Sequence, residues 1–423
     1  MHGGGTKLDT ITHNPPVARL LDLTRLVSRA GRVATGVDRV ELAYLERFLA
    51  ELEPVFGLVR TAFGYVLLDR DGLQGLLDRI QGRVGWGPVD RLSRVALRLE
   101  PMQRRAQADV RRLAAARAPR YRLRQMLVQY LPQGVAYVNV GHTNLTDRVI
   151  DALRNGPKAR VAVMIHDTIP LDYPEFQRPE SVTRFKGLLR RTRAWTDVVL
   201  YNSTQTQTNA ERHMAQWGPV PRGVVAHLGV EMITPDAAAL PAGLVPDAPY
   251  FVSVGTIEPR KNHALLLDVW EQLENEMGAD APHLFICGAR GWKNEEIFRR
   301  LDALKHRESH VHEVASLADP AMMALVQGAA GALFPSLAEG FGLPPLEAAA
   351  LGVPVICADL AVYQEFLGDI PVYVGPMERY LWLGKIKDLA EDQRAGKAAT
   401  RRDKPIIELP NWNTHFNVVL KVT

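Results

Sequence analysis

Two glutamates in the segment FPSLAEGFGLPPLEAAALGVPVI have a spacing that could serve binding or catalysis. Glu339 and Glu347 are separated by seven residues, which include a Gly-Phe-Gly loop and a Pro-Pro pair. Proline favours the first turn of a helix, which predicts Glu347 within that turn and Glu339 on the loop before it. Backbone N–H groups of residues 340–343 would then attract phosphate, and the two acids could bind sugar or ribose hydroxyls. The alternative is that Glu347 only complements the helix dipole.

Charged and titratable residues follow two other predicted strands. In VGTIEPRKNHALLL, Arg260 and Lys261 stand between a strand and a helix, where they could neutralise a departing diphosphate. In MIHDTIPLDYPEF, His166 and Asp167 end a strand. Ligands of parallel α/β sheets bind at the carboxyl ends of strands, so both loops are candidate site loops. The alternatives are a solvated Arg-Lys pair and a structural histidine.

The elements that position these loops alternate between strands and helices. Strand-length apolar runs occur at VARLLDL, GVAYVNV, RVAVMIHD, DVVLYNS and GVVAHLGV, with helical patterns over 37–52, 147–155, 181–195 and 205–216. A second series of runs begins at YFVSVGTI and continues through HLFICGA, HVHEVA, GALFPS, PVICAD and VYVGP. This alternation predicts two parallel sheets with helices on both faces, although residues 54–133 fit it least well.

The length of the chain also indicates two domains. A chain of 423 residues exceeds the ~250–300 residues at which a single core stops growing. The segment 232–248 is rich in Pro and Ala and lacks periodicity, which is typical of a linker. We therefore predict a flexible leader over 1–16, a Rossmann-like domain over 17–232, a linker over 233–248 and a second Rossmann-like domain over 249–407. Neither half contains a Gly-x-Gly-x-x-Gly turn, which disfavours a nicotinamide-dependent dehydrogenase.

Composition excludes several other classes of protein. The chain is 47% hydrophobic and 23% charged, which excludes disorder and a collagen-like or coiled-coil protein. Cys287 and Cys357 cannot form a disulfide framework or a multi-thiolate zinc site and are interpreted as buried thiols in a reducing cytosol. The sequence shows no window of ~18 apolar residues and no signal-peptide core, so neither a transmembrane helix nor secretion is expected.

A strongly basic segment is hidden by the net charge of +4. Between Arg79 and Arg124 there are 13 arginines and three acids, a net charge of +10. Apolar residues recur at helical spacing from Leu92 to Leu99, which predicts a basic amphipathic helix. Three interpretations are open: a solvated helical face, a surface for anionic lipid and a nucleic-acid patch. The last is disfavoured because lysine is absent and aromatic residues are few.

The motifs GTIEPRKN, CGARGW, FPSLAEGFGLPPLEAAALGVPVI and IHDTIPLDYPEF together resemble those of glycosyltransferase family 4. Members of that family are retaining, nucleotide-sugar-dependent enzymes of the GT-B fold. The resemblance covers residues 17–420 and is most specific at the glutamate pair. It implies an α/β protein in which two Rossmann-like, doubly wound domains face a central cleft. ELPNWNTHFNVVL resembles the family's closing helix, which implies that a helix over 408–423 packs back on the N-terminal domain.

The resemblance also implies roles for individual residues. Glu347 would hold the ribose, Glu339 and nearby amides the donor sugar, and Lys261 the diphosphate. Many family members have an arginine about five residues before this lysine, where this chain has Thr256, so Arg260 is the candidate for the second phosphate contact. The implied catalytic residues are His166, Arg260, Lys261 and Glu339, and the implied donor-binding residues are Gly36, Gly255, Val314, Gly340, Phe341, Gly342, Leu343 and Glu347.

The predicted function is transfer of a sugar from a nucleotide-diphosphate sugar to a hydroxyl of a saccharide or lipid-linked glycan, as in polysaccharide biosynthesis. No metal or cofactor is expected. EPRKNH and RGW resemble motifs of enzymes that use GDP-mannose-type donors. The alternatives are a sugar-nucleotide epimerase or phosphorylase of the same fold and a non-catalytic GT-B partner subunit. We expect a cytoplasmic protein, peripheral on the inner membrane face through Arg79–Arg124, without a nucleic-acid partner.

Overall fold

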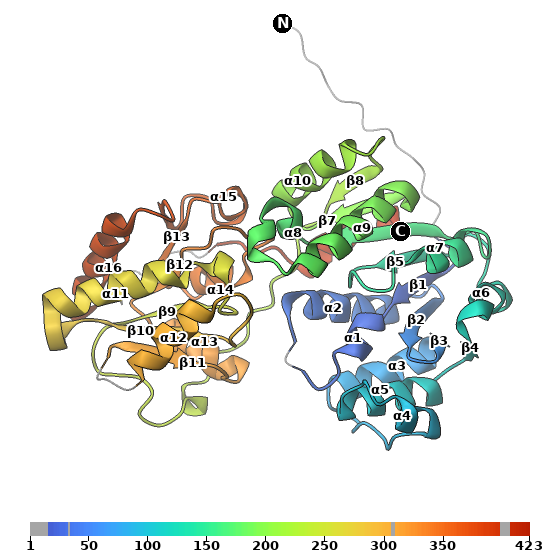
Figure 1. The fold of residues 1–423 in the computed structure, drawn as a ribbon, viewed down its shortest axis with the longest axis horizontal. Helices are drawn as coiled ribbons and strands as arrows, with labels where there is room; N and C mark the ends of the chain where they lie inside the picture. The colour runs from blue at the N-terminus through green and yellow to red at the C-terminus, as the bar shows by residue number, and fades with distance from the viewer. Residues whose placement is uncertain (1–15, 33, 306–308, 398–406) are drawn as a thin grey trace, which may run out of the picture.

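The computed structural model describes residues 16–32, 34–305, 309–397 and 407–423. Two α/β domains lie side by side, each built on its own sheet (Figure 1). Residues 1–15 of the predicted leader lie outside the described residues. Two parallel-sheet domains are what the alternation of strands and helices predicts, and this prediction is confirmed.

An eight-stranded sheet forms the centre of the N-terminal domain. Its order is β4-β3-β2-β1-β5-β6-β7-β8, and the pairs β2–β3 and β3–β4 are antiparallel while the other pairs are parallel. The antiparallel strands come from the region 54–133, which explains why that region does not follow the strand–helix alternation. The strands are β1 (Arg19–Asp22), β2 (Val55–Thr61), β3 (Gly64–Leu68), β4 (Ala116–Ala118), β5 (Ala136–Asn139), β6 (Arg160–Ile165), β7 (Val198–Tyr201) and β8 (Arg222–Val225).

Helices cover both faces of this sheet. Consecutive residues of a strand point to opposite faces, so Leu20 and Leu21 of β1 belong to two different buried clusters. Ser203 caps α10 by accepting a hydrogen bond from the backbone N–H of Thr206. The helices are α1 (Thr24–Ser28), α2 (Gly36–Ala50), α3 (Arg70–Ile80), α4 (Arg91–Val95), α5 (Pro101–Arg112), α6 (Leu123–Tyr130), α7 (Asp147–Arg154), α8 (Ile169–Asp172), α9 (Pro179–Trp195) and α10 (Thr204–Ala215).

The amphipathic helix predicted between Leu92 and Leu99 is wrong in length. The helix α4 has only five residues and ends at Val95. Ser93 and Ala96 are buried, whereas the side chains of Leu92 and Val95 are 44% and 66% exposed. Ser93 and Ala96 therefore face the domain, and the side chains of Leu92 and Val95 face solvent.

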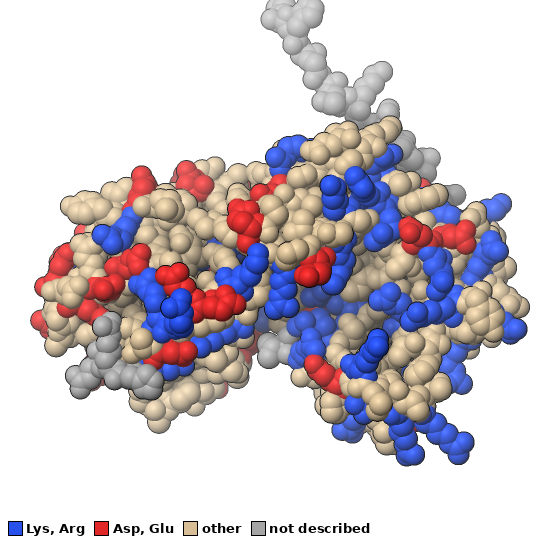
Figure 2. All heavy atoms as spheres, viewed as in Figure 1, with Lys and Arg blue, Asp and Glu red and all other residues tan. Residues whose placement is uncertain are grey.

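Hydrogen bonds to Ser93 account for this orientation. Asp90 caps the turn by accepting from the backbone N–H of Ser93 at 2.7 Å. The hydroxyl of Ser93 donates to the carbonyl of Arg104 in α5 at 2.8 Å. These polar contacts draw Ser93 inward, so its aliphatic neighbours face solvent. Figure 2 shows Lys and Arg side chains spread over the N-terminal domain on the face drawn.

A six-stranded, wholly parallel sheet forms the C-terminal domain, in the order β11-β10-β9-β12-β13-β14. Cys287 and Cys357 are buried free thiols in two of its strands. The strands are β9 (Tyr250–Val254), β10 (His283–Cys287), β11 (Val311–Val314), β12 (Gly331–Phe334), β13 (Val355–Ala358) and β14 (Val372–Val374). The helices are α11 (His263–Met277), α12 (Glu295–Leu304), α13 (Asp319–Gly328), α14 (Leu343–Ala350), α15 (Ala361–Leu367) and α16 (Arg379–Arg394). Among the described residues, no helix is long and apolar enough to cross a bilayer.

The chain passes between the domains twice. The first passage follows β8, and by Asp236 the backbone already donates a hydrogen bond to the carbonyl of Pro320 in the C-terminal domain. The second passage leads to α18 (Trp412–Val422), which packs on α2 of the N-terminal domain. There the ring of Phe416 meets that of Tyr44 at 5.0 Å. The two passages lie side by side, since Val230 donates a backbone hydrogen bond to Pro410. The C-terminus accordingly lies at the N-terminal domain (Figure 1).

His415 of α18 joins this junction through both ring nitrogens. Its Nε2 lies 2.8 Å from the hydroxyl of Tyr44, and its Nδ1 lies 3.1 and 3.0 Å from the carbonyls of Ala226 and His227. A nitrogen that faces carbonyls must donate, so Nδ1 carries the proton and Nε2 accepts from the tyrosine. Burial lowers the pKa of His415 to about 4.

We expect acid to weaken this junction. The unfolded chain binds a proton at His415 near a pKa of ~6.5, whereas the folded chain binds it only near about 4. Neutral His415 therefore makes its full contribution to the stability of the folded state above pH 6.5. This contribution is lost as the pH falls toward 4, by roughly 1.4 kcal/mol per pH unit. In His415→Gln, the free energy of unfolding should fall less between pH 7 and pH 5 than it does in the wild type. The difference should be roughly 1.4 kcal/mol for each pH unit below 6.5, and denaturant unfolding at the two pH values measures it. An unchanged pH dependence would contradict the assigned state of His415.

Candidate functional site

The two domains touch where the Gly-Phe-Gly loop meets the end of β6. A Cβ placed on Gly340 would lie 2.7 Å from the carbonyl oxygen of His166, so only glycine fits at this position. The hydroxyl of Thr206, in the first helical turn after β7, donates to the carbonyl of Gly340 at 3.3 Å. The loops that the sequence singled out in the two domains are thus in contact.

Glu339 lies at the centre of a buried cluster of charges. Its carboxylate accepts from a guanidinium nitrogen of Arg260 at 2.5 Å and from the ammonium of Lys261 at 2.6 Å. The hydroxyl of Ser336 donates to the same carboxylate at 2.7 Å. Burial opposes ionisation, but the two cations outweigh it and lower the pKa of Glu339 to about 2. Glu339 is therefore a fixed anion with little free capacity to accept further hydrogen bonds.

Arg260 and Lys261 differ in how many of their hydrogen-bond donors are used by acceptors of the protein. Arg260 also pairs with Glu258 at 2.7 Å and donates to the carbonyl of Ala338 at 3.0 Å. Lys261 makes its ion pair with Glu339, and burial followed by repulsion from Arg260 lowers its pKa. An ammonium group has three donors. Lys261 therefore keeps donors for a ligand, whereas Arg260 has its guanidinium shared among protein acceptors.

Gly255 makes room for Lys261. Gly255 has φ of 146°, and a Cβ at that position would lie 3.3 Å from the Lys261 ammonium. A larger residue would displace the ammonium from Glu339.

Glu347 has a different environment from Glu339. The helix α14 begins at Leu343, so Glu347 stands on its second turn and not on the first, as the sequence predicted. Its nearest cation is Arg39 of α2, whose guanidinium lies 3.9 Å from the carboxylate. Burial raises the pKa of Glu347, and Arg39 only partly offsets this. Glu347 is thus a carboxylate without a close partner among the described residues.

A cavity of roughly 220 Å³ lies between the domains in front of Glu347. Gly36 at the N-terminus of α2 and Leu343 at the N-terminus of α14 both line it. A Cβ on Gly36 would lie 3.8 Å from the Leu343 side chain, so the two helix N-termini lie next to each other at the wall of the cavity. Gly342, the residue that precedes α14, has φ of 98°, which glycine adopts without strain. The N-terminus of α2 has free backbone N–H groups at this end, whereas Pro344 and Pro345 in the first turn of α14 have none.

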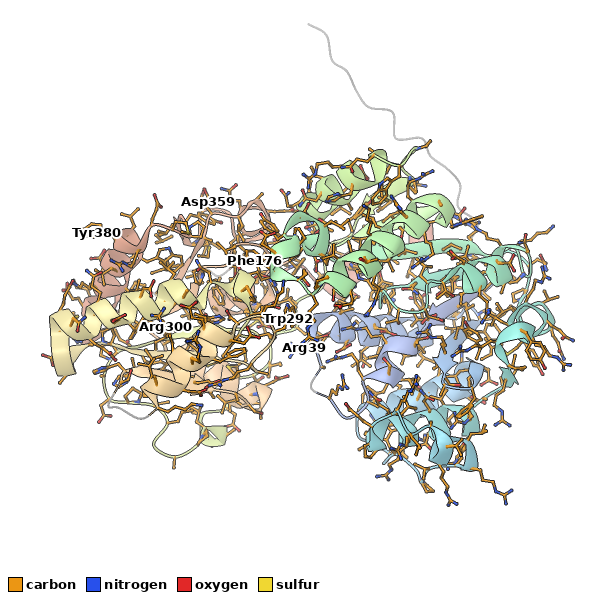
Figure 3. All side chains as sticks on the ribbon, in the orientation of Figure 1. Arg39, Phe176, Trp292, Arg300, Asp359 and Tyr380 are labelled. Atoms are coloured by element: carbon orange, nitrogen blue, oxygen red, sulfur yellow. The ribbon has the colours of Figure 1, made fainter. Side chains whose placement is uncertain are left out.

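Arg39 is a residue of this cavity that the sequence analysis did not select. Besides its approach to Glu347, it forms an ion pair with Asp319 of the C-terminal domain at 3.1 Å. Figure 3 places Arg39 at the boundary between the domains. The signal in the sequence was its position in the first turn of α2, three residues after Gly36, which puts both residues at the same end of the helix.

His166 is held as a neutral residue beside the domain contact. Its Nε2 donates to the carbonyl of Val140 at 2.6 Å, and its ring packs on that of His142 at 4.9 Å. Burial and the neighbouring His142 lower the pKa of His166 to about 3. Its own carbonyl accepts from the amide of Asn202 at 2.8 Å. The imidazole is therefore uncharged at neutral pH, and its backbone is fixed against Gly340.

Two other predicted residues lie at the edge of the site. The ring of Phe341 is buried against Phe366 at 4.2 Å, so only its backbone is available to a ligand. Val314 ends β11, and its carbonyl accepts from the backbone of Gly288 at 2.9 Å. Both lie in the C-terminal domain but outside the cavity in front of Glu347.

Two further contacts join the domains. The indole of Trp292, in the CGARGW motif, donates to the carbonyl of Phe176 at 3.0 Å, and Figure 3 shows both at the domain boundary. Glu365 of α15 accepts from the backbone N–H of Thr204 at 2.8 Å and pairs with His227 at 2.9 Å. In the described part of the chain, no group of three or more His, Cys, Asp or Glu residues is arranged to hold a metal ion.

The chain is similar in sequence to a family model and to several named proteins. Residues 241–394 match the family model described as glycosyl transferases group 1. The serotype-specific mannosyltransferase WbdA of Escherichia coli is 29% identical over 229 residues, which are 51% of this chain and 28% of that protein. O-antigen chain mannosyltransferase B of Escherichia coli is 31% identical over 153 residues, which are 36% of this chain and 40% of that protein. The chain therefore spans less than half the length of these relatives.

Solved structures agree on the fold. The Anabaena protein HepE, in complex with UDP and glucose, aligns with a TM-score of 0.59 at 16% identity over 96% of both chains. TarM aligns with a TM-score of 0.52 at 14% identity over 75% of this chain and 60% of that one. The predicted GT-B fold, with two Rossmann-like domains, is confirmed.

The different environments of the two glutamates predict different effects of the same substitution. Glu339→Gln would leave buried Lys261 without its counter-charge and Arg260 with Glu258 alone, and should lower the free energy of unfolding by about 3–5 kcal/mol. Glu347→Gln removes only a long ion pair and should change it by less than about 1 kcal/mol. Denaturant unfolding of both variants at pH 7 checks this. Equal losses of stability would contradict the assignment of Glu339 as the paired acid.

Proposed function

We propose that the protein is a retaining glycosyltransferase that moves a sugar from a nucleotide-diphosphate donor to a hydroxyl of a saccharide or lipid-linked glycan. The observation that supports the proposal is that the two glutamates differ in their ion pairing and in their position relative to the cavity. Glu347 is a loosely paired carboxylate that faces a cavity between the domains, while Glu339 fixes Lys261, which is not among the residues that line this cavity. A loosely paired carboxylate can accept hydrogen bonds from the hydroxyl groups of a ribose, and an ammonium with free donors suits a phosphate.

Three features support a diphosphate in the cavity. The N-termini of α2 and α14 lie next to each other there, and the N-terminus of α2 attracts anions. Arg39 supplies a cation from the N-terminal domain at the cavity, and Glu339 holds Lys261, which has free donors, outside the cavity lining. Together these groups can take up the charge of a leaving diphosphate. Arg39 thus fits the second phosphate contact better than Arg260, which Glu258 and Glu339 already occupy.

The state of the candidate catalytic groups favours transfer on one face of the sugar. Glu339 is neutralised by two cations and is poorly suited to form a covalent bond with the anomeric carbon. His166 donates from Nε2 to a carbonyl and is not a proton donor to substrate. We propose that the bond from the anomeric carbon to the diphosphate breaks and the bond to the acceptor oxygen forms on the same face. The acceptor proton then passes to the departing phosphate oxygen.

The named relatives support a mannosyl donor. Two of them are described as mannosyltransferases, one of them of O-antigen chains. We therefore propose a donor of the GDP-mannose type and an acceptor in polysaccharide biosynthesis at the cytoplasmic face of a membrane. A thermal-shift series with GDP-mannose, UDP-glucose, GDP and UDP tests the donor, because a ligand that binds only the folded state raises its melting temperature.

Loss of Glu347 should abolish transfer without unfolding the protein. Glu347→Gln should lower the rate of sugar transfer by at least about 100-fold, equivalent to roughly 2.7 kcal/mol, because the donor loses its ribose contact. The measurement is product formation from GDP-mannose and a saccharide acceptor. Lys261→Ala should give a similar loss, whereas Glu296→Gln, exposed on α12, serves as a control and should not. Near-wild-type transfer by both site variants would refute the proposed function.

Arg39 should contribute to binding of the diphosphate and not of the base. In Arg39→Gln, the affinity for GDP or UDP should fall about tenfold, since a charge-assisted hydrogen bond contributes about 1.5 kcal/mol. The affinity for guanosine or uridine should stay within about twofold. Isothermal titration calorimetry compares the two, with Arg148→Gln on α7 as the control for a lost surface charge. A parallel loss of nucleoside affinity would show that Arg39 acts only by holding the cavity in shape.

A further inference from the structure

The turn around α4 carries exposed aliphatic side chains and free cations together. We propose that this turn, Arg91–Arg98, is the element with which the protein docks on a bilayer that contains anionic phospholipid. This inference extends the proposed function, in which the acceptor lies at a membrane. It depends on different residues, however, and is tested by a different measurement.

The aliphatic side chains of the α4 turn point away from the domain. Leu92, Val95 and Leu97 are 44%, 66% and 77% exposed, within a stretch of six residues. Solvated aliphatic groups at this density are unfavourable in water and become buried when they enter the boundary between headgroups and acyl chains. The sequence left open which way Leu92 and Val95 face, and in the structure they face solvent.

Arginines surround these aliphatic side chains. Arg91, Arg94 and Arg98 are exposed, and their guanidinium groups form no ion pair with another residue in the described part of the chain. Some other arginines of the basic segment bind acceptors within the N-terminal domain. Arg79 pairs with Asp109, and Arg105 donates to the carbonyl of Gly87. Exposed arginines without an ion pair therefore remain at two places in the described part of the basic segment, the α4 turn and the stretch from Arg117 to Arg124. Of these two places, the α4 turn combines its arginines with three exposed aliphatic side chains within six residues.

The α4 turn is held rigidly in this orientation. The buried guanidinium of Arg111 donates to both carboxylate oxygens of Asp90 at 2.7 Å, and Asp90 caps the turn. The hydroxyl of Ser93 bonds to α5. A rigid turn presents its side chains without an ordering cost on binding.

Lipid fits this combination better than a nucleic acid. Exposed aliphatic side chains beside arginines match an interface of apolar chains and anionic headgroups. Single-stranded nucleic acid is bound by aromatic stacking, which aliphatic side chains do not provide. Figure 1 places α4 at the lower end of the N-terminal domain, and Figure 2 shows blue side chains that project there and a hollow between the domains at the same lower edge. A docked turn would thus hold the cleft near the membrane surface.

The test is co-sedimentation of the full chain with vesicles made of equal parts phosphatidylcholine and phosphatidylglycerol. Replacing Arg91, Arg94 and Arg98 by Gln should weaken binding about a hundredfold, because each arginine near an anionic surface contributes about fivefold. The double variant Val95→Glu, Leu97→Glu should also lose binding, by at least about tenfold. Circular dichroism should show the wild-type fold in both.

A matched control removes the same charge elsewhere. Arg120, Arg122 and Arg124 are exposed in the same basic segment, at and beside the start of α6. Replacing these three by Gln should change vesicle binding by less than about threefold, since charges beyond a Debye length of ~8 Å are screened. Equal losses in the two triple variants would overturn the inference, as would retention on heparin with no binding to the vesicles. Vesicle binding that depends on α4, in a protein without sugar transfer, would support the inference and refute only the proposed function.

Discussion

The ion cluster of Glu339 is the interaction on which the cleft depends. A buried carboxylate is stable only when it is paired, and here Arg260 and Lys261 supply the pairing from the loop after β9. The cluster ties that loop to the loop after β12, so the carboxyl ends of two neighbouring strands are fixed together. With this edge rigid, Gly340 can meet the backbone of His166 and bring the second domain within hydrogen-bonding distance.

Several of the contacts between the domains are polar. The Gly340 loop, the indole of Trp292, the carboxylate of Glu365 and the pairs made by Arg39 all cross the boundary. Such contacts can break and re-form without exposing a large apolar surface, which suits a cleft that must admit a ligand. The apolar junction is instead between α18 and α2, where the chain returns to its first domain.

The basic segment shows how composition and structure differ in what they report. Counting residues gives a uniformly positive stretch, but the structure divides its arginines into two groups. One group satisfies carbonyls and buried acids inside the domain, as Arg111 does for Asp90. The other, around α4 and from Arg117 to Arg124, remains available to solvent. A count cannot separate these groups, because the acids and carbonyls that bind the first group are brought near only by folding.

The sequence by itself determined the alternation of strands and helices, the two Rossmann-like domains and the loops that carry Glu339, Lys261 and His166. These features follow from local periodicity and from the rule that loops at the carboxyl ends of parallel strands share one edge. Only the tertiary structure decided which glutamate is neutralised, that α4 is a single turn with its aliphatic side outward, and that Arg39 reaches Asp319 from 280 residues away. Such pairings depend on distances between residues remote in the sequence, and no local pattern encodes those distances.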